Sequence, residues 1–226
     1  MHGAVRDVLA HVRRVLTVEL GSVVDNPVIV ASEDGASYEV MSTGNFHGEP
    51  LAFAGDMLAM ASAELASISE RRTDRMLDPA FSRGLPPFLA VDAGTNSGYM
   101  IAQYTAAALV SENKILAHPA SVDTIPTSGN QEDHVSMGWT SARKLGEVLA
   151  NVRRELAVEL LCAAQGLDLR SGIAATSPAL AGAHARLREE VAPMDVDREL
   201  APQLAAVEAL LPELVAAAER VTGPLS

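Results

Sequence analysis

The sequence predicts a mainly α-helical fold, a bundle of long helices with one small β-hairpin near residues 28–41. Aromatic residues make up only 4% of the 226 residues, while the chain is rich in Ala and Leu, which are strong helix formers. Apolar residues recur at steps of three and four along several long stretches. Strand-like runs flank a single Asp-Gly turn, so strand is a minor component. The length favours one domain over residues 1–226.

The first helix is expected over residues 4–20, because the apolar residues of this stretch fall on one face: Val5, Val8, Leu9, Val12 and Leu16. Asp25-Asn26-Pro27 then signals a turn. The apolar runs at 28–30 and 38–40 flank Asp34-Gly35, which predicts the hairpin.

A long helix is expected from about 49 to 73, ended by the charged run 70–74. Pro79, Pro86 and Pro87 predict an extended connection after it. The next helix should occupy 98–118, where Pro119 stops it.

Another long helix is expected from about 133 to 165, and at 1.5 Å per residue it approaches about 50 Å. Its apolar stripe has the spacing of bundled helices: Ala142, Leu145, Leu149, Val152, Leu156, Leu160 and Ala163. Such a stripe in a short chain predicts association with other polypeptide. Residues 177–221 should form two or three helices, broken near Pro193, Pro202 and Pro212.

Composition excludes several classes of partner. The net charge is −12 and no basic patch offsets it, so nucleic acid and anionic membrane surfaces are not expected partners. No uninterrupted run of about 18 apolar residues predicts a membrane span. The single cysteine, Cys162, sits in an apolar helical run, which predicts a buried thiol and a cytoplasmic location.

Two polar loops concentrate the chemistry of the chain. Residues 44–50 (GNFHGEP) carry an aromatic ring, an imidazole and a carboxylate, although Asn45 as a helix cap, Phe46 as a packing residue and His47 as a solvated side chain would also explain them. Residues 127–134 (TSGNQEDH) place Glu132 and Asp133 where a helix is expected to begin. These carboxylates could cap the helix, or they could bind a ligand or transfer a proton, and the sequence leaves both interpretations open.

Other site classes find no support in the sequence. No metal site is expected, because His47 and Glu49 lack a third ligand at helical spacing and no His-Glu-x-x-His occurs. No nucleophile elbow, P-loop or dinucleotide motif is present. The glycine-rich stretch 94–98 lacks a phosphate-loop lysine and is interpreted as a lead-in to a helix.

Taken together, these stretches resemble the histidine and aromatic amino acid ammonia-lyases. The matching segments follow the family's order and cover nearly the whole chain: SVVDNP at 22–27, GNFHGEP at 44–50, SISERRTDR at 67–75, NSGYMIAQYTAAALVSENK at 96–114, SVDTIPTSGNQEDHVSMGW at 121–139 and AAQGLDLR at 163–170. GNFHGEP and QEDHVSMG are the most specific of them.

The resemblance implies a homotetrameric helical enzyme whose active sites draw residues from three subunits. It also implies a methylidene-imidazolone electrophile, made from an internal Ala-Ser-Gly. Carried onto this chain, it implies that Phe46 lies beside the substrate ring, that Glu132 acts near the amino group or imidazole, and that Gln131 binds beside it. Asn45, His47, Asn130 and His134 are implied to support these residues.

The family's Ala-Ser-Gly, catalytic tyrosines and carboxylate-binding arginine are expected upstream of this region, and a helix beginning almost at Met1 agrees with that. The chain is therefore expected to be the carboxy-terminal portion of the enzyme. Ala36-Ser37 precedes Tyr38 rather than glycine, and Thr127-Ser128-Gly129 lies in the Glu132 loop, so neither is expected to cyclise.

Three hypotheses follow. The chain is an ammonia-lyase component that is inactive alone and works with a companion chain carrying the amino-terminal half; histidine is the expected substrate, with tyrosine or phenylalanine left open. Alternatively, it is a catalytically silent helical scaffold or regulatory subunit. A third possibility is a truncated piece of a full-length lyase.

Overall fold

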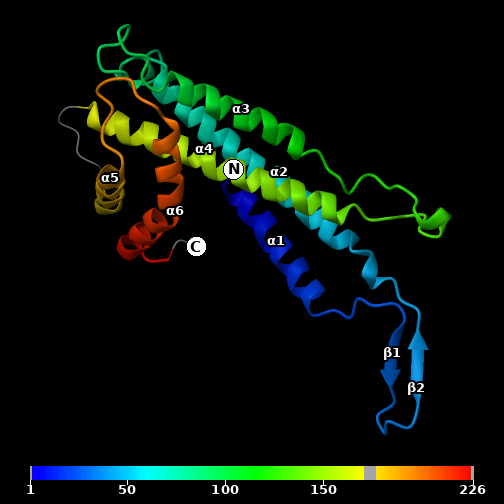
Figure 1. Cartoon of the computed structure of the whole chain (residues 1–226). Coiled ribbons are helices and arrows are strands. Elements are labelled where there is room, and N and C mark those ends of the chain that lie inside the picture. The colour runs from blue at the N-terminus through cyan, green and yellow to red at the C-terminus, as the bar shows by residue number, and fades with distance from the viewer. Residues whose placement is uncertain (1, 171–176, 225–226) are drawn as a thin grey trace. The chain divides into compact units, whose positions relative to one another are not determined.

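The computed structural model describes residues 2–170 and 177–224 (Figure 1). In chain order its elements are α1 (His2–Leu20), β1 (Val28–Ala31), β2 (Tyr38–Met41), α2 (Glu49–Leu77), α3 (Met100–Leu116), α4 (Gly138–Asp168), α5 (Pro178–Glu190) and α6 (Ala201–Thr222). Single 3-10 turns lie at Asn45–His47, Pro87–Leu89 and Ser128–Asn130. The mainly helical fold with one hairpin is confirmed.

Two compact units divide the chain. The first comprises Met1–Ser62 and Ile115–Val148, and the second comprises Ala63–Lys114 and Leu149–Ser226. The helices α2 and α4 each begin in the first unit and end in the second. The first unit therefore holds both polar loops singled out in the sequence.

The hairpin of the first unit pairs β1 with β2 in antiparallel register, with Val28 opposite Met41 and Ala31 opposite Tyr38. Asp34 and Gly35 form the turn, where Gly35 takes φ +68 and the Asp34 carboxylate accepts hydrogen bonds from Ser32 Oγ and the amide of Ala36. These two hydrogen bonds lower the pKa of Asp34. The Asp-Gly signal thus fixed the position of the turn.

In the first unit α2 and α4 approach so closely that a glycine is needed. A Cβ added at Gly55 would lie 2.5 Å from Ser141 Oγ. That hydroxyl is buried and donates to the carbonyl of Ala52 at 2.8 Å, so it has little freedom to move away. Backbone contact between the two helices therefore depends on the absence of a side chain at position 55.

We expect Gly55→Ala to destabilise the chain by about 1–3 kcal/mol, the usual cost of overpacking a core contact. Urea unfolding followed by circular dichroism measures this cost. Adding Ser141→Ala removes the clashing oxygen, because the next nearest atom is then the residue-141 Cβ at 3.5 Å. Stability should recover in part in the double variant, and strictly additive effects of the two changes would contradict the steric account.

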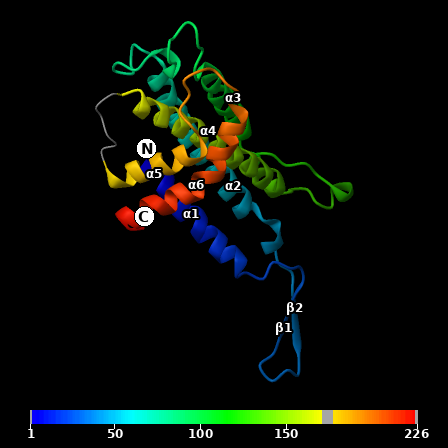
Figure 2. The same ribbon diagram turned by 60° about the vertical axis from the view of Figure 1, so that its left-hand side comes forward.

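In the second unit the later parts of α2 and α4 pack with α3 (Figures 1 and 2). Gln103 Nε2 donates to the Asp74 carboxylate at 2.8 Å, which joins α3 to α2. Asn151 Nδ2 donates to the Glu112 carboxylate at 2.7 Å, which joins α4 to α3. The hydrophobic core lies between these helices and includes the buried residues Leu77, Leu89, Tyr99, Val158, Leu161 and Cys162. The predicted burial of Cys162 is confirmed, and burial raises the pKa of its thiol.

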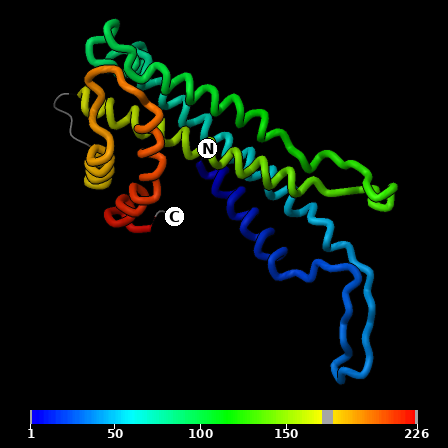
Figure 3. The backbone as a smooth tube through the Cα atoms, viewed as in Figure 1, coloured from blue at the N-terminus to red at the C-terminus, as the bar shows by residue number. Residues whose placement is uncertain are grey.

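Residues 191–200 connect α5 to α6, which pack against each other (Figure 3). Gln165 on α4 is buried and holds this connection, because its amide exchanges two hydrogen bonds of 3.0 Å with the backbone of Met194. Asp197 accepts hydrogen bonds from the amides of Ser97 and Gly98, and these bonds lower its pKa. The glycine-rich stretch 94–98 is thereby anchored as the lead-in to α3.

Three predicted boundaries are wrong. The helix α2 continues through the charged run to Leu77, because Arg72 forms an ion pair with Glu159 on α4 and Glu70 pairs with Arg71. The helix α4 begins at Gly138 rather than near 133. The predicted break at Pro212 is absent, since α6 runs through it while neighbouring Val207, Leu210 and Leu214 are buried.

Two helical stretches, Asn45–Leu77 and Ala201–Thr222, reach the length and apolar composition of a membrane span, although no such stretch was expected. A core helix meets the same criterion. Asp56 is buried on α2 and its carboxylate accepts 2.8 Å hydrogen bonds from the amides of Ala120 and Ser121. Because the buried Asp56 carboxylate has protein partners, we interpret α2 as a core helix.

Candidate functional site

The two polar loops of the first unit, 44–50 and 124–137, meet in space although about 80 residues separate them in sequence. His47 Nε2 donates to the carbonyl of His134 at 2.8 Å, so Nε2 carries the proton when this bond forms. The two imidazole rings stack at 5.4 Å between centroids and 18° between planes. Ser136 Oγ donates to the carbonyl of His47. These contacts fix the loops against each other.

Loop 44–50 is a 3-10 turn followed by a left-handed residue. Gly48 ends the turn with φ +77, a conformation that favours glycine, and α2 begins at the next residue. Asn45 does not cap α2; its amide lies 3.4 Å from the carbonyl of Val23. Phe46 is half exposed, at 51%, so it does not pack as a core residue. The structural explanations offered for Asn45 and Phe46 are therefore wrong.

The loop that carries Glu132 is closed at its base by two sets of hydrogen bonds. Thr124 Oγ1 donates to the carbonyl of Val135 at 3.1 Å and accepts from its amide at 2.7 Å. The amide of Thr127 donates to the carbonyl of Glu132 at 2.9 Å. Between these residues, 128–130 all take positive φ, from 52 to 69. The loop is thus held in a tight, sparsely populated conformation.

This closure settles the open question about capping. Glu132 and Asp133 precede α4 by several residues, and its first turn contains no acidic side chain. The carboxylate of Glu132 is exposed, as is the amide of Gln131, and neither side chain makes a hydrogen bond or ion pair to residues 2–170 or 177–224. The backbone of Glu132 is held in place while its carboxylate makes none of these contacts. Such a carboxylate is suited to bind a cationic group or to accept a proton.

The structure therefore brings His47 and His134 into contact and places Phe46 on one joined loop and Glu132 on the other. Asn130 lies in the left-handed stretch beside Gln131, where asparagine is tolerated better than most residues. The roles of all seven candidate residues remain predictions from the resemblance.

Sequence reasoning missed Ser136, Thr124 and Trp139. The side-chain hydroxyls of Ser136 and Thr124 bond backbone groups of residues distant in sequence, and such pairings leave no signal in the sequence. Trp139 is the only tryptophan of the chain and is 82% exposed. It borders a cavity of about 480 Å³ in the first unit, whose walls include Val12, Leu16, Leu51, Leu58 and Leu145. An exposed indole beside an apolar cavity is typical of an interaction surface.

The methylidene-imidazolone group that the resemblance implies does not fit the residues of this chain. No Ala-Ser-Gly occurs in the 226 residues. Ala36-Ser37 leads into β2, where the amide and carbonyl of Ser37 are both hydrogen bonded to Ser32. Any such group would have to come from residues outside this sequence.

Comparisons with known proteins identify a matching family and several relatives. Residues 1–189 match the family model of aromatic amino acid lyases. The chain is 56% identical to a histidine ammonia-lyase of Symbiobacterium thermophilum over 227 residues, covering all of this chain and 44% of that protein. Among solved structures, histidine ammonia-lyase from Trypanosoma cruzi is similar with a TM-score of 0.89 and 45% identity, covering 97% of this chain and 42% of the other.

Tyrosine aminomutase from Streptomyces globisporus is also similar, with a TM-score of 0.92 and 40% identity, covering 99% of this chain and 42% of that one. The chain thus spans less than half the length of the relatives it matches. The family match over most of the chain and the high identity to full-length relatives lead to one conclusion: the chain belongs to the aromatic amino acid lyase family.

Proposed function

We propose that this chain is the substrate-facing part of an ammonia-lyase that removes ammonia from histidine and releases the unsaturated acid. The observation that carries the proposal is the His47–His134 contact, which joins the loop of Phe46 to the loop of Glu132. Identity of 52–56% to several histidine ammonia-lyases supports histidine as the substrate.

Within this proposal each side chain has a task. The half-exposed ring of Phe46 packs against the substrate ring. The Glu132 carboxylate binds the amino group or imidazole and moves a proton there, and Gln131 donates or accepts a hydrogen bond beside it. Asn45, Asn130, His47 and His134 keep the two loops in place. The methylidene-imidazolone, supplied by a companion polypeptide, provides the electrophile.

Uncovered apolar surface supports the need for other polypeptide. Large apolar side chains of α1 are exposed although the helix is amphipathic, including Leu9, Leu16, Val18 and Leu20. Trp139 is exposed as well. Exposed apolar surface of this kind predicts a protein–protein interface. We therefore infer a homo- or hetero-oligomer with the companion chain, formed in the cytosol, where the buried free Cys162 stays reduced.

Reconstitution tests the proposal. The purified chain is mixed with the portion of the Symbiobacterium thermophilum relative that it does not match, and release of ammonia and of the unsaturated acid from histidine is assayed. The chain alone should turn over nothing, while the mixture should be active on histidine and less so on tyrosine and phenylalanine. A mixture that forms a complex yet remains inactive on all three would refute the proposal in favour of a silent scaffold.

A ¹⁹F label on Trp139 supplies an independent measure of assembly. Incorporating 5-fluorotryptophan into this chain alone gives a single ¹⁹F resonance, because the chain has one tryptophan. Burial by the companion should shift that resonance. Activity and docking are then read separately, so an inactive complex is distinguished from failure to associate.

A further inference from the structure

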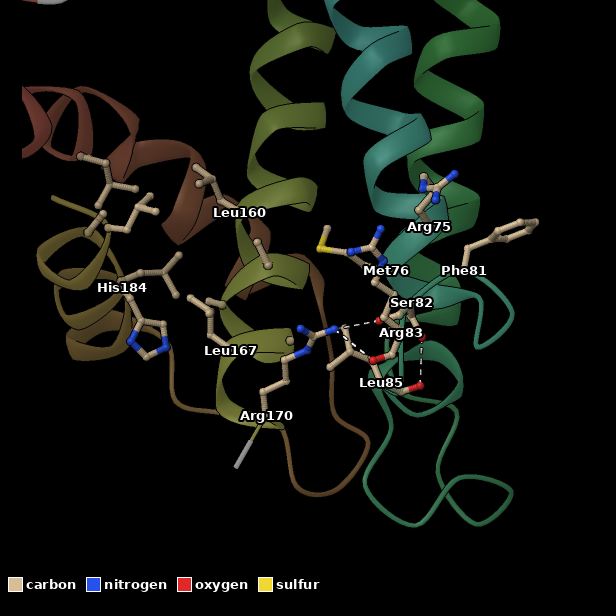
Figure 4. A pocket seen from close by; sticks show the side chains of 17 residues that line it. Arg75, Met76, Phe81, Ser82, Arg83, Leu85, Leu160, Leu167, Arg170 and His184 are labelled. Atoms are coloured by element: carbon tan, nitrogen blue, oxygen red, sulfur yellow. Dashed lines mark hydrogen bonds between the residues drawn. The ribbon is translucent and has the colours of Figure 1, made fainter. Parts of the chain in front are cut away.

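A second cavity, of about 480 Å³, lies entirely within the second unit (Figure 4). It is formed by the end of α2, the following loop, the end of α4, and side chains of α5 and α6. Apolar side chains make most of its wall, including Met76, Leu85, Leu160, Leu167, Leu180 and Leu187. Its size falls within the range of small-molecule sites. None of the candidate lyase residues lines it.

The ionisable residues of this wall are all cationic or imidazole groups. They are Arg75, Arg83, Arg170 and His184, and the wall contains no Asp or Glu. This is notable in a chain with a net charge of −12. The cavity thus combines an apolar interior with positive charge at its edge.

Two of these groups, Arg170 and His184, already contact other residues of the chain and hold the walls of the cavity in place. Arg170 reaches across to the carbonyls of Ser82 and Arg83, at 3.0 and 3.2 Å, and so holds the loop that closes one side (Figure 4). His184 Nε2 lies 2.8 Å from the Asp168 carboxylate, which also pairs with Arg188. These contacts position α5 and the loop on either side of α4.

The other two guanidinium groups have no acidic partner in the part of the chain that the structure describes. Arg75 lies over the ring of Phe81 at 5.3 Å, and it makes no ion pair to residues 2–170 or 177–224. Arg83 makes no side-chain hydrogen bond or ion pair within those residues either. Arginine binds carboxylates through paired hydrogen bonds, so a guanidinium group without an acidic partner is suited to bind a carboxylate ligand.

We propose that this cavity binds a small carboxylate with an apolar body, whose hydrocarbon part contacts the leucine walls while the carboxylate binds Arg75 and Arg83. The apolar walls exclude a highly charged ligand such as a polyphosphate, because burying several charges against leucine is costly. The two guanidinium groups, which have no ion pair to residues 2–170 or 177–224, exclude a cationic amphiphile by repulsion. One anionic group on an apolar body satisfies both conditions.

Octanoate, kept below its micellar concentration, is the probe, and octan-1-ol and octylammonium are its neutral and cationic counterparts. Binding to the full purified chain is measured by calorimetry. The ¹³C-methyl signal of Met76 reports occupancy of the cavity, and that of Met60, in the first unit, serves as an internal reference. Octanoate should bind at least tenfold more tightly than octan-1-ol and shift the Met76 signal alone, while octylammonium should not bind.

Variants locate the contact. Arg75→Gln with Arg83→Gln should weaken octanoate binding at least tenfold and leave octan-1-ol unaffected. The matched pair Arg13→Gln with Arg143→Gln makes the same change in net charge on first-unit residues outside the cavity. It should change neither octanoate binding nor octan-1-ol binding. Leu167→Trp should fill the cavity and abolish binding of both octanoate and octan-1-ol. If circular dichroism shows Leu167→Trp to be misfolded, Ala163→Phe serves the same purpose.

Three results would overturn the proposal. Equal binding of octanoate and octylammonium, or an octanoate affinity unchanged by the double arginine variant, would mean that the arginines do not recognise a carboxylate. Self-association that is abolished by Leu167→Trp, together with no response to octanoate, would make this face an interface between copies of the chain.

Discussion

Replacing Glu132 by glutamine is expected to lower turnover of the reconstituted lyase by about 10²- to 10⁴-fold, the range that a positioned acid or base contributes. The change keeps the size of the side chain and removes its charge and its ability to accept a proton. The backbone of residue 132 is held by the amide of Thr127, so the loop should keep its conformation. The effect should therefore arise from chemistry and not from folding.

Asp133→Asn is the matched control, because this carboxylate neighbours Glu132, is also exposed and precedes α4 in the same loop. It should leave turnover nearly unchanged. Steady-state assays across a range of pH, with ¹⁹F detection of docking, compare both variants with the parent. If the two variants lose activity equally, or if the Glu132 variant loses only companion binding, the proposed role of Glu132 is wrong.

The helix α1 could be predicted from its apolar periodicity, although the structure buries only Val5 and Val12 of the predicted apolar face. The start of α4 could not. Polar residues at 127–134 look like a helix start, yet side-chain hydrogen bonds from Thr124 to Val135 stabilise a closed loop instead. Pro212 was misjudged for a related reason: it removes one backbone donor, while burial of Leu210 and Leu214 on either side favours continuation of α6.

The predicted apolar stripe of α4 shows that residue spacing alone does not identify the buried face of a helix. Leu145, Leu156 and Leu160 of that stripe are only partly buried, and Leu149 is 42% exposed. The face that the structure buries contains Val148, Asn151, Val152, Glu155, Val158 and Cys162, three and four residues apart but partly polar. A polar residue enters a core when neighbouring helices accept it, which the sequence of one helix does not reveal. The uncovered leucines agree with the association proposed above.

The candidate site was found in the sequence for a different reason. Its two loops stand out by their density of polar and aromatic residues, and the resemblance assigned their roles. The contact between His47 and His134 could not be predicted, because it depends on how α2 and α4 bring two distant loops together.

Glu155→Gln is expected to stabilise the chain strongly at alkaline pH. Glu155 is fully buried on α4, and neither carboxylate oxygen has a hydrogen-bond partner among residues 2–170 and 177–224. Burial first, and then the nearby carboxylates of Glu70 and Glu159, raise the pKa of Glu155 from 4.5 to about 8. The folded state therefore keeps this side chain protonated at neutral pH, where an unfolded chain would have lost the proton.

The sign of the pH dependence follows. Between about pH 4.5 and 8 the folded chain binds one proton more than the unfolded chain, so this group makes the free energy of unfolding fall as pH rises. A shift of this size corresponds to a loss on the order of 4 kcal/mol, complete above about pH 8. Glutamine keeps the shape and does not ionise. The variant should therefore resemble the parent near pH 5 and exceed it in stability by a few kcal/mol at pH 9.

Urea unfolding at pH 5, 7 and 9 measures this difference, with Glu147→Gln as the control because Glu147 is an exposed carboxylate paired with Arg143 on the same helix. The control should change stability little at any of the three pH values. A Glu155→Gln variant whose stability tracks that of the parent from pH 5 to 9 would show that Glu155 is ionised in the folded chain. The buried carboxyl would then have a charged or hydrogen-bonding partner, and burial alone would not determine its protonation.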